Sequence, residues 1–363
     1  MSLEMKVTNA DLGWDSFFEK NFEQYKNQNY VAMRIVRENR GQYVAYNETG
    51  KFLCELPGKF RFDNPNKNQL PTVGDWVVVS VLPNEKKAMI HTILPRKSIF
   101  SRKASGEVTE EQSIATNIDT VFIITGLDLN YNLRRIERFL SIVIDSGALP
   151  VILLNKADLY PEYEQRKLEV EAIAEGVDVH TISAFNQQDL EKLKKYIKTG
   201  ETIAFLGSSG VGKSTIINAL LKTDQLKVNE VSELGSRGRH TTTFRELIVL
   251  PKGGMVIDTP GIREIQVWGD EKIVGKVFDD IQELAVNCRF RDCTHINEPG
   301  CAVLEAVKNG TLEDERYKSF LKLKKESAYL SARQTMKASA VEKTRWKVIT
   351  KSAKQLKKNK IYD

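Results

Sequence analysis

The glycine-rich segment Gly207-Ser-Ser-Gly-Val-Gly-Lys213-Ser214 is the strongest indication of the fold in this sequence. It follows an apolar run at 202–206 that is typical of a buried strand, and it precedes a pattern at 213–221 that favours a helix. A glycine-rich turn between a strand and a helix lets successive backbone N–H groups face a phosphate, and the helix N-terminus adds its positive dipole end. The spacing G-x-x-x-x-G-K-[ST] therefore predicts a phosphate-binding loop.

Two side chains of this loop carry the expected chemistry. Lys213 should reach the β- and γ-phosphate oxygens and act as a catalytic residue, and the Ser214 hydroxyl should bind Mg²⁺. The residues predicted to contact the nucleotide here are Gly207, Ser208, Ser209, Gly210, Val211, Gly212, Lys213, Ser214 and Thr215.

An acidic motif, Asp258-Thr-Pro-Gly261, follows the strand-like residues 254–257. A carboxylate at the end of a strand that faces the phosphate loop can hold Mg²⁺, often through water. We therefore expect Asp258 to be a magnesium ligand and the Gly261 N–H to donate to the γ-phosphate.

Two further motifs predict a guanine site. Asn155, Lys156, Ala157 and Asp158 come directly after a buried run at 151–154. Guanine presents N1–H and an exocyclic amine side by side, and the Asp158 carboxylate can accept from both. Adenine would leave that carboxylate unpaired, which is costly. We expect Asn155 to hold the loop together and to touch the base, while the stem of Lys156 packs on its face.

The dipeptide Ser183-Ala184 completes the predicted base site. It follows the strand-like residues 178–182, and we expect its backbone N–H groups to donate to guanine O6. Strand runs separated by helical runs between residues 118 and 268 indicate βαβ units and a mainly parallel sheet.

The part of the chain before this α/β region has a different pattern. Five short β-rich runs within residues 29–96 are separated by turn residues and predict a small barrel. An oligonucleotide-binding (OB) barrel has five strands, but a Src-homology-like barrel fits the pattern nearly as well. Residues 97–117 are polar without apolar periodicity and are interpreted as a linker, and residues 1–28 as an N-terminal extension.

Three cysteines and a histidine cluster near the C-terminus. Cys288, Cys293, His295 and Cys301 supply three thiolates and one imidazole, which complete a closed tetrahedral zinc shell of the structural kind. We predict one structural Zn²⁺ per chain. The fourth cysteine, Cys54, lies alone in a predicted strand and is expected in a core.

Composition excludes several classes of protein. The 363 residues are 41% hydrophobic and 28% charged, which excludes collagen-like, disordered and disulfide-scaffold chains. No window approaches the ~18 apolar residues of a transmembrane helix, and no secretory signal is recognised at the start. Both observations favour the cytoplasm and give no reason to expect a membrane partner.

The charge is unevenly distributed. Residues 318–363 hold 14 basic and 3 acidic residues, a net charge of +11, so the rest of the chain contributes −5 to the total of +6. A basic tail on an acidic body suggests a polyanionic partner, although a solvated helix face is the more common reason for such a run.

The order of the motifs is a circular permutation of the usual GTPase order. The base motifs at 155–158 and 183–184 precede the phosphate loop, and Asp258-Thr-Pro-Gly261 follows it. With a barrel before and a Cys/His cluster after, the chain resembles the bacterial ribosome-small-subunit-dependent GTPases, the RsgA, YjeQ or YloQ family. The resemblance covers about residues 29–310 and implies an OB-type β-barrel, a circularly permuted α/β P-loop GTPase domain at 118–268 and a zinc-binding helical domain at 269–310. Residues 311–363 are predicted to form a basic helical tail, which is long and basic for the family.

The resemblance also implies an activity and a partner. It implies a monomer that binds GTP and GDP with Mg²⁺ and hydrolyses GTP during late maturation of the 30S ribosomal subunit, in contact with its 16S rRNA. Binding to the ribosome would stimulate turnover, and hydrolysis would release the protein.

The run 237–243 is interpreted as switch one, the loop from which a threonine closes over Mg²⁺ when GTP is bound. In the run 237–243 we expect Thr242 to close over Mg²⁺, with Thr241 and Thr243 as alternatives. Ile262 stands where Ras-type GTPases carry a water-orienting glutamine. The resemblance implies that His240 takes this catalytic role, while a structural loop histidine remains the alternative.

Two other functions fit the same residues. One is a GTPase switch that acts on another RNA or protein target. The other is an RNA-binding scaffold that holds GTP without turnover. Hydrolysis measured with and without 30S subunits separates the three.

Overall fold

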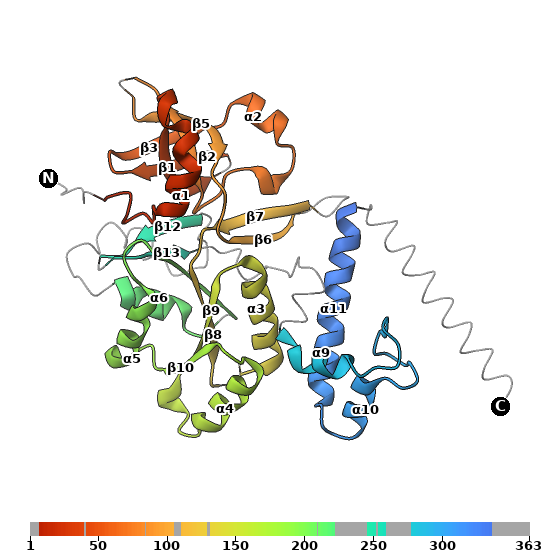
Figure 1. Cartoon of the computed structure of the whole chain (residues 1–363). Coiled ribbons are helices and arrows are strands. Elements are labelled where there is room, and N and C mark those ends of the chain that lie inside the picture. The colour runs from red at the N-terminus through yellow and green to blue at the C-terminus, as the bar shows by residue number, and fades with distance from the viewer. Residues whose placement is uncertain are drawn as a thin grey trace. The chain divides into compact units, whose positions relative to one another are not determined.

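The computed structural model describes residues 7–39, 41–83, 85–104, 110–128, 131–208, 210–221, 245–251, 253–258 and 277–335 (Figure 1). The chain divides into two compact units. The first comprises residues 1–102 and 113–265, and the second comprises residues 103–112 and 266–363. Among the described residues, no helix is long and apolar enough to cross a lipid bilayer.

Five strands of the first unit close into a barrel (Figure 1). They are β1 (Val31–Asn39), β2 (Gln42–Asn47), β3 (Gly50–Glu55), β4 (Trp76–Val81) and β5 (Lys87–Ile93). Neighbours follow the order β1-β2-β3-β5-β4, and a pairing between β4 and β1 closes the ring. The β3–β5 pair is parallel and the others are antiparallel. The predicted five-stranded barrel is confirmed, and this crossed order agrees with an OB-type barrel.

Alternate residues of the barrel strands fill its interior, as the period of two in a strand requires. The buried set is Met33, Ile35, Tyr43, Ala45, Phe52, Cys54, Val77, Val79, Ala88 and Ile90. Cys54 is one of them, which agrees with its predicted place in a core. The short helices α2 (Gly58–Asp63) and η2 (Lys67–Gln69) connect β3 to β4.

The residues before the barrel pack against it. They form α1 (Ser16–Phe22) and η1 (Glu23–Gln28). The Asp15 carboxylate caps α1 by accepting from the N–H of Phe17 at 3.0 Å. The Trp14 ring lies 4.7 Å from the ring of the fully buried Trp76 of β4. The described part of the predicted extension therefore belongs to the core of the first unit.

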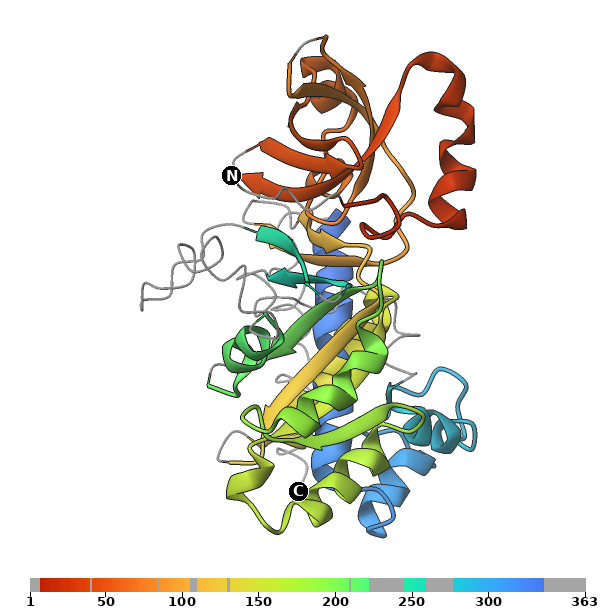
Figure 2. The same cartoon turned by 90° about the vertical axis from the view of Figure 1, so that its left-hand side faces the viewer.

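The α/β part of the first unit is built on six strands. They are β8 (Thr120–Gly126), β9 (Leu149–Asn155), β10 (Asp178–Ile182), β11 (Thr202–Gly207), β12 (Arg245–Val249) and β13 (Met255–Asp258). Their order is β10-β9-β8-β11-β13-β12, and all pairs are parallel except β13 with β12. β8 and β11 lie side by side in the sheet (yellow and green in Figure 2). This arrangement confirms the predicted mainly parallel sheet.

Helices cover both faces of this sheet. They are α3 (Leu133–Ser146), α4 (Tyr163–Ile173), α5 (Gln187–Lys192), η4 (Leu193–Tyr196) and α6 (Lys213–Leu221). α3 and α4 lie on one side of the strands and α5 and α6 on the other (Figure 1). One core combines alternate strand residues, such as Phe122, Ile124 and Phe205, with Leu190 of α5 and Ile216 of α6.

The interpretation of residues 97–117 as a linker needs correction. The structure places β6 (Ile99–Ala104) and β7 (Glu110–Thr116) there, paired as a two-stranded sheet. Phe100 and Ile114 are buried, but neither strand shows a run of alternating apolar and polar residues, so the sequence gives no strand period there. The Arg96 guanidinium also pairs with the buried Asp75 carboxylate at 2.7 Å and donates to Ser113, which ties β7 to the barrel.

The barrel and the α/β sheet share hydrogen-bonded strands. β1 continues past the barrel and pairs antiparallel with β12, so the two sheets form one eleven-stranded sheet. The register places Arg37 opposite Glu246 and Glu38 opposite Arg245. Oppositely charged residue types across an antiparallel pair stabilise it.

The second unit contains α9 (Asp279–Ala285), α10 (Ala302–Lys308) and α11 (Asp314–Thr335). Phe320 of α11 stacks edge-on against Phe278 at 5.6 Å, and Arg316 pairs with Asp280 at 2.6 Å. The start of the predicted basic tail is therefore helical, as expected, but packs into the same core as the zinc-binding residues. Residues 336–363 of that tail lie outside the described part of the chain.

Candidate nucleotide and zinc sites

The predicted phosphate loop joins β11 to α6. Two of its positions have no room for a side chain, so they require glycine. A Cβ on Gly207 would lie 2.4 Å from the Ile124 carbonyl oxygen, and a Cβ on Gly212 would lie 2.2 Å from Asn155 Nδ2. The Lys213 ammonium donates to the Gly207 carbonyl at 2.7 Å. Ser214 is exposed in the first turn of α6. The loop thus presents backbone, lysine and serine at one helix N-terminus, which suits an anion.

Asn155 joins three motifs that are far apart in the sequence. Its side-chain N–H donates to the Val211 carbonyl of the phosphate loop at 2.7 Å. Its side-chain oxygen accepts from the Ala184 N–H at 3.0 Å. Asn155 is 2% exposed, so these bonds are protected from water. One buried amide therefore holds the predicted base and phosphate loops together across the permuted order.

The two residues after Asn155 have distinct conformations. Lys156 adopts a left-handed backbone with φ of 70°, and its ammonium pairs with the Asp128 carboxylate at 2.5 Å. Asp158 follows in the short helix η3 (Ala157–Leu159), and it is exposed. The carboxylate expected to recognise guanine is therefore open to a ligand.

The amides of Ser183 and Ala184 differ from the prediction. The Ser183 N–H donates to Asp189 Oδ2 at 2.9 Å, and the Ala184 N–H donates to Asn155. Both N–H groups that were expected to face guanine O6 already have acceptors. The competing acceptors are side chains from a neighbouring helix and a neighbouring strand, which the local sequence does not reveal.

Two residues near the motifs were not predicted. Asp128 follows β8 and pairs with Lys156, and Arg135 in the first turn of α3 donates to the Ser208 hydroxyl at 3.3 Å. Both follow a strand that is next to β11 in the sheet. Their only sequence signal is their position after the carboxyl end of a buried parallel strand.

The remaining predicted residues are placed in part. Asp258 ends β13, which pairs with β11, so its backbone lies one strand from the phosphate-loop strand. The other predictions for the nucleotide site lie outside the described residues: Ser209, His240, Thr241, Thr242, Thr243, Gly261 and Ile262.

The predicted zinc ligands converge in the second unit. The ligand atoms of Cys288, Cys293, His295 and Cys301 all lie within 4.8 Å of one another. The Cys288 and Cys301 sulfurs are 3.8 Å apart, and His295 Nδ1 lies 3.6 and 3.5 Å from them. A tetrahedral zinc has edges of roughly 3.8 Å between sulfurs and roughly 3.5 Å between sulfur and nitrogen, given its usual bond lengths. The residues therefore fit Zn²⁺.

The surroundings favour the metal-binding forms of Cys288 and His295, whereas burial raises the pKa of Cys293 to about 11. Burial opposes the thiolate of Cys288, but N–H groups of Val303 and Ala302 at the start of α10 outweigh it, so the pKa of Cys288 is lowered. Burial lowers the pKa of His295, which favours the neutral imidazole. The Tyr317 hydroxyl donates to the His295 carbonyl at 2.6 Å and fixes that residue in its left-handed conformation.

Comparison with known proteins identifies the family. A model of the RsgA GTPase family matches residues 93–268. A small ribosomal subunit biogenesis GTPase RsgA from Opitutus terrae is 42% identical, over 94% of this chain and 96% of the relative. A protein of the same name from Syntrophotalea carbinolica is 39% identical, over 95% of this chain and 96% of the relative.

Two solved structures agree with the fold. The crystal structure of YjeQ from Thermotoga maritima has a TM-score of 0.60 and 30% identity, over 82% of this chain and 99% of that one. The structure of YloQ, described as a circularly permuted GTPase, has a TM-score of 0.57 and 27% identity, over 84% and 97%. The chain belongs to the RsgA GTPase family.

Proposed function

We propose that this GTP hydrolase acts as a late assembly factor of the 30S ribosomal subunit, bound through 16S rRNA as a monomer. Relatives that share about 40% of its residues over most of the chain are named small ribosomal subunit biogenesis GTPases. The observation that carries the GTPase part of the proposal is that Asn155 donates to the Val211 carbonyl and accepts from the Ala184 N–H, because these two bonds unite the permuted motifs in one site.

In this proposal the base loops select guanine. The exposed Asp158 carboxylate accepts from guanine N1–H and from the exocyclic amine. The stem of Lys156 packs on the base, while its ammonium stays on Asp128. To bind guanine O6, the N–H of Ser183 or Ala184 would have to donate to O6 and to its present acceptor at the same time.

The phosphate side of the proposed site supplies charge and orientation. Lys213 would leave the loop carbonyls and reach the β- and γ-phosphates, where negative charge develops. Mg²⁺, when bound, neutralises the same oxygens. We propose Ser214, Asp258 and Thr242 as its ligands, and His240 as the residue that orients the attacking water.

Two parts of the chain suit rRNA. OB-type barrels bind oligonucleotides, and α11 carries the basic residues Lys318, Lys322, Lys324 and Lys325. Lysines that neutralise phosphates release counterions, so binding to 30S should weaken as salt rises.

Asp158→Asn should shift the base preference. The amide cannot accept from both guanine donors, but it can donate to the C2 oxygen of xanthine. We expect calorimetry to show GTP affinity reduced by roughly 10- to 100-fold and a gain for xanthosine triphosphate. Asp63→Asn, on α2 of the barrel, is the matched control. Unchanged GTP affinity without xanthine preference would place the base site elsewhere.

Turnover with purified 30S subunits tests the proposed partner. We expect slow hydrolysis by the isolated protein, because Ile262 stands where a water-orienting glutamine is common. Adding 30S should raise kcat, and the rise should diminish as salt increases. Equal turnover with and without 30S at low salt would leave a GTPase that acts on another target.

A further inference from the structure

A charged pair joins the barrel to the strands next to the proposed magnesium site. Arg37 of β1 donates from Nε to Glu246 Oε1 of β12 at 3.1 Å, and its Nη2 contacts the same oxygen. In the register of β12 with β13, Glu246 lies opposite Asp258. Arg37 of β1, Glu246 of β12 and Asp258 of β13 therefore lie opposite one another in three neighbouring strands of the sheet.

A register shift in β1 allows a second arginine to face the same way. Residues 34 and 37 would lie on opposite faces of a regular strand. The pairing of β1 with β2 shifts between Ile35 and Arg37, as an extra residue in the strand requires. Arg34 accordingly donates to the Thr202 hydroxyl of β11 at 2.9 Å, while Arg37 contacts β12.

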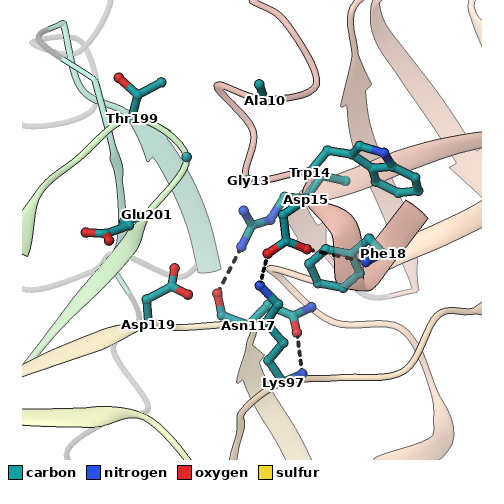
Figure 3. A pocket seen from close by; sticks show the side chains of 12 residues that line it. Ala10, Gly13, Trp14, Asp15, Phe18, Lys97, Asn117, Asp119, Thr199 and Glu201 are labelled. Carbon is teal, nitrogen blue, oxygen red and sulfur yellow. Dashed lines mark hydrogen bonds and ion pairs between the residues drawn. The ribbon is translucent and has the colours of Figure 1, made fainter. Parts of the chain in front are cut away.

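Arg34 anchors the other end of this contact. It is 2% exposed and donates to the Gly74 carbonyl of the barrel at 3.3 Å and to the Asn117 carbonyl at 3.0 Å. Beside it lies a pocket of about 370 Å³, which Asp15, Lys97, Asn117, Asp119 and Glu201 help to line (Figure 3). The Arg34 end of β1 is thus fixed to the barrel, to β11 and, by a contact of 3.6 Å with the Met255 sulfur, to β13, while Arg37 is the contact to β12.

We propose that Arg37 is a positioning residue for GTP hydrolysis, which acts through Glu246 on β12 and on the end of β13 that carries Asp258. This inference rests on the proposed role of Asp258 in the hydrolysis reaction. Without Arg37, the Glu246 carboxylate is unpaired at the position opposite another acidic residue, and like charges across an antiparallel pair repel. Arg37 compensates this charge and holds the two strands in register.

The geometry separates effects on turnover from effects on binding. The base loops follow β9 and β10, and neither strand pairs with β1. GTP binding should therefore be nearly independent of Arg37. Both partners are partly exposed, with 36% and 25% of their side chains accessible, and ion pairs of that kind contribute little to unfolding free energy. A change in kcat without a matching change in KM or melting temperature is expected.

Steady-state hydrolysis by the full chain tests the proposal. Arg37→Ala should lower kcat by roughly 5- to 10-fold, with KM for GTP within about 2-fold of wild type, because small displacements of reacting groups cost turnover. Arg37→Lys keeps the charge and should recover most of the loss. Arg61→Ala is the matched control, since Arg61 is an exposed arginine of the same barrel that contacts the Gly41 carbonyl.

A double-mutant cycle tests whether Arg37 acts on turnover through Glu246. Arg37→Ala combined with Glu246→Ala should lose less kcat than Arg37→Ala alone, because the second change removes the unpaired carboxylate. Additive losses, or wild-type kcat in Arg37→Ala, would overturn the inference while the proposed function stands. No hydrolysis by the wild-type protein would instead refute the proposed function.

Discussion

Replacing Lys213 with alanine is expected to lower GTP turnover by roughly 10²- to 10³-fold or more, the scale for loss of one preorganised transition-state donor. The Lys213 ammonium lies in the phosphate loop, 2.7 Å from the Gly207 carbonyl. From there it can reach the phosphoryl oxygens on which charge develops. Single-turnover hydrolysis measures the loss directly, without the contribution of product release.

Lys167→Ala is the control for the Lys213 substitution. Lys167 lies on α4 and pairs with Glu171 at 3.5 Å, one turn along the same helix. The Lys167→Ala variant should hydrolyse GTP at the wild-type rate. Circular dichroism should show both variants folded, because Lys213 supports no buried core. Wild-type turnover in the Lys213 variant would show that the loop is not the catalytic site.

Replacing Cys288 with serine is expected to remove the zinc and unfold the part of the second unit that holds the four ligands. Metal binding and folding are one process in small metal sites, where zinc contributes about 10–16 kcal/mol. The described core there is small, with Phe278, Ile281 and Phe320 among its buried residues. The zinc content measured by metal analysis should fall from one ion per chain to none. The backbone amides of α10 should lose their protection from hydrogen exchange.

Cys54→Ser is the matched control for the zinc prediction. Cys54 lies in the barrel core, where burial raises the pKa of its thiol to about 12, so it offers no thiolate to a metal. This variant should keep one zinc per chain. A Cys288→Ser protein with full zinc content and unchanged exchange would contradict the assigned ligands.

Local chemistry made several features predictable from the sequence. The helix at 213–221 has the expected bounds because a strand, a glycine turn and a helix follow one another without interruption. The zinc cluster was predictable because its four ligands lie within fourteen residues of chain, from Cys288 to Cys301. The barrel was predictable because turn residues separate its strands.

Features that depend on distant partners were not predictable. The local sequence of β6 and β7 predicts a linker because Phe100 and Ile114 become buried only when the unit folds. The pairing of β1 with β12 joins residues 209 positions apart, such as Arg37 and Glu246, and no local pattern signals it. The amides at 183–184 have acceptors that are likewise supplied by other elements.

We propose that the bound nucleotide controls how tightly this protein binds the 30S subunit, with GTP favouring binding and hydrolysis favouring release. Cosedimentation with purified 30S, in GDP and in a non-hydrolysable GTP analogue, measures this directly. We expect tighter binding with the analogue, by roughly 5- to 150-fold if the coupling free energy has the usual size. Equal binding in the two nucleotide states would contradict it.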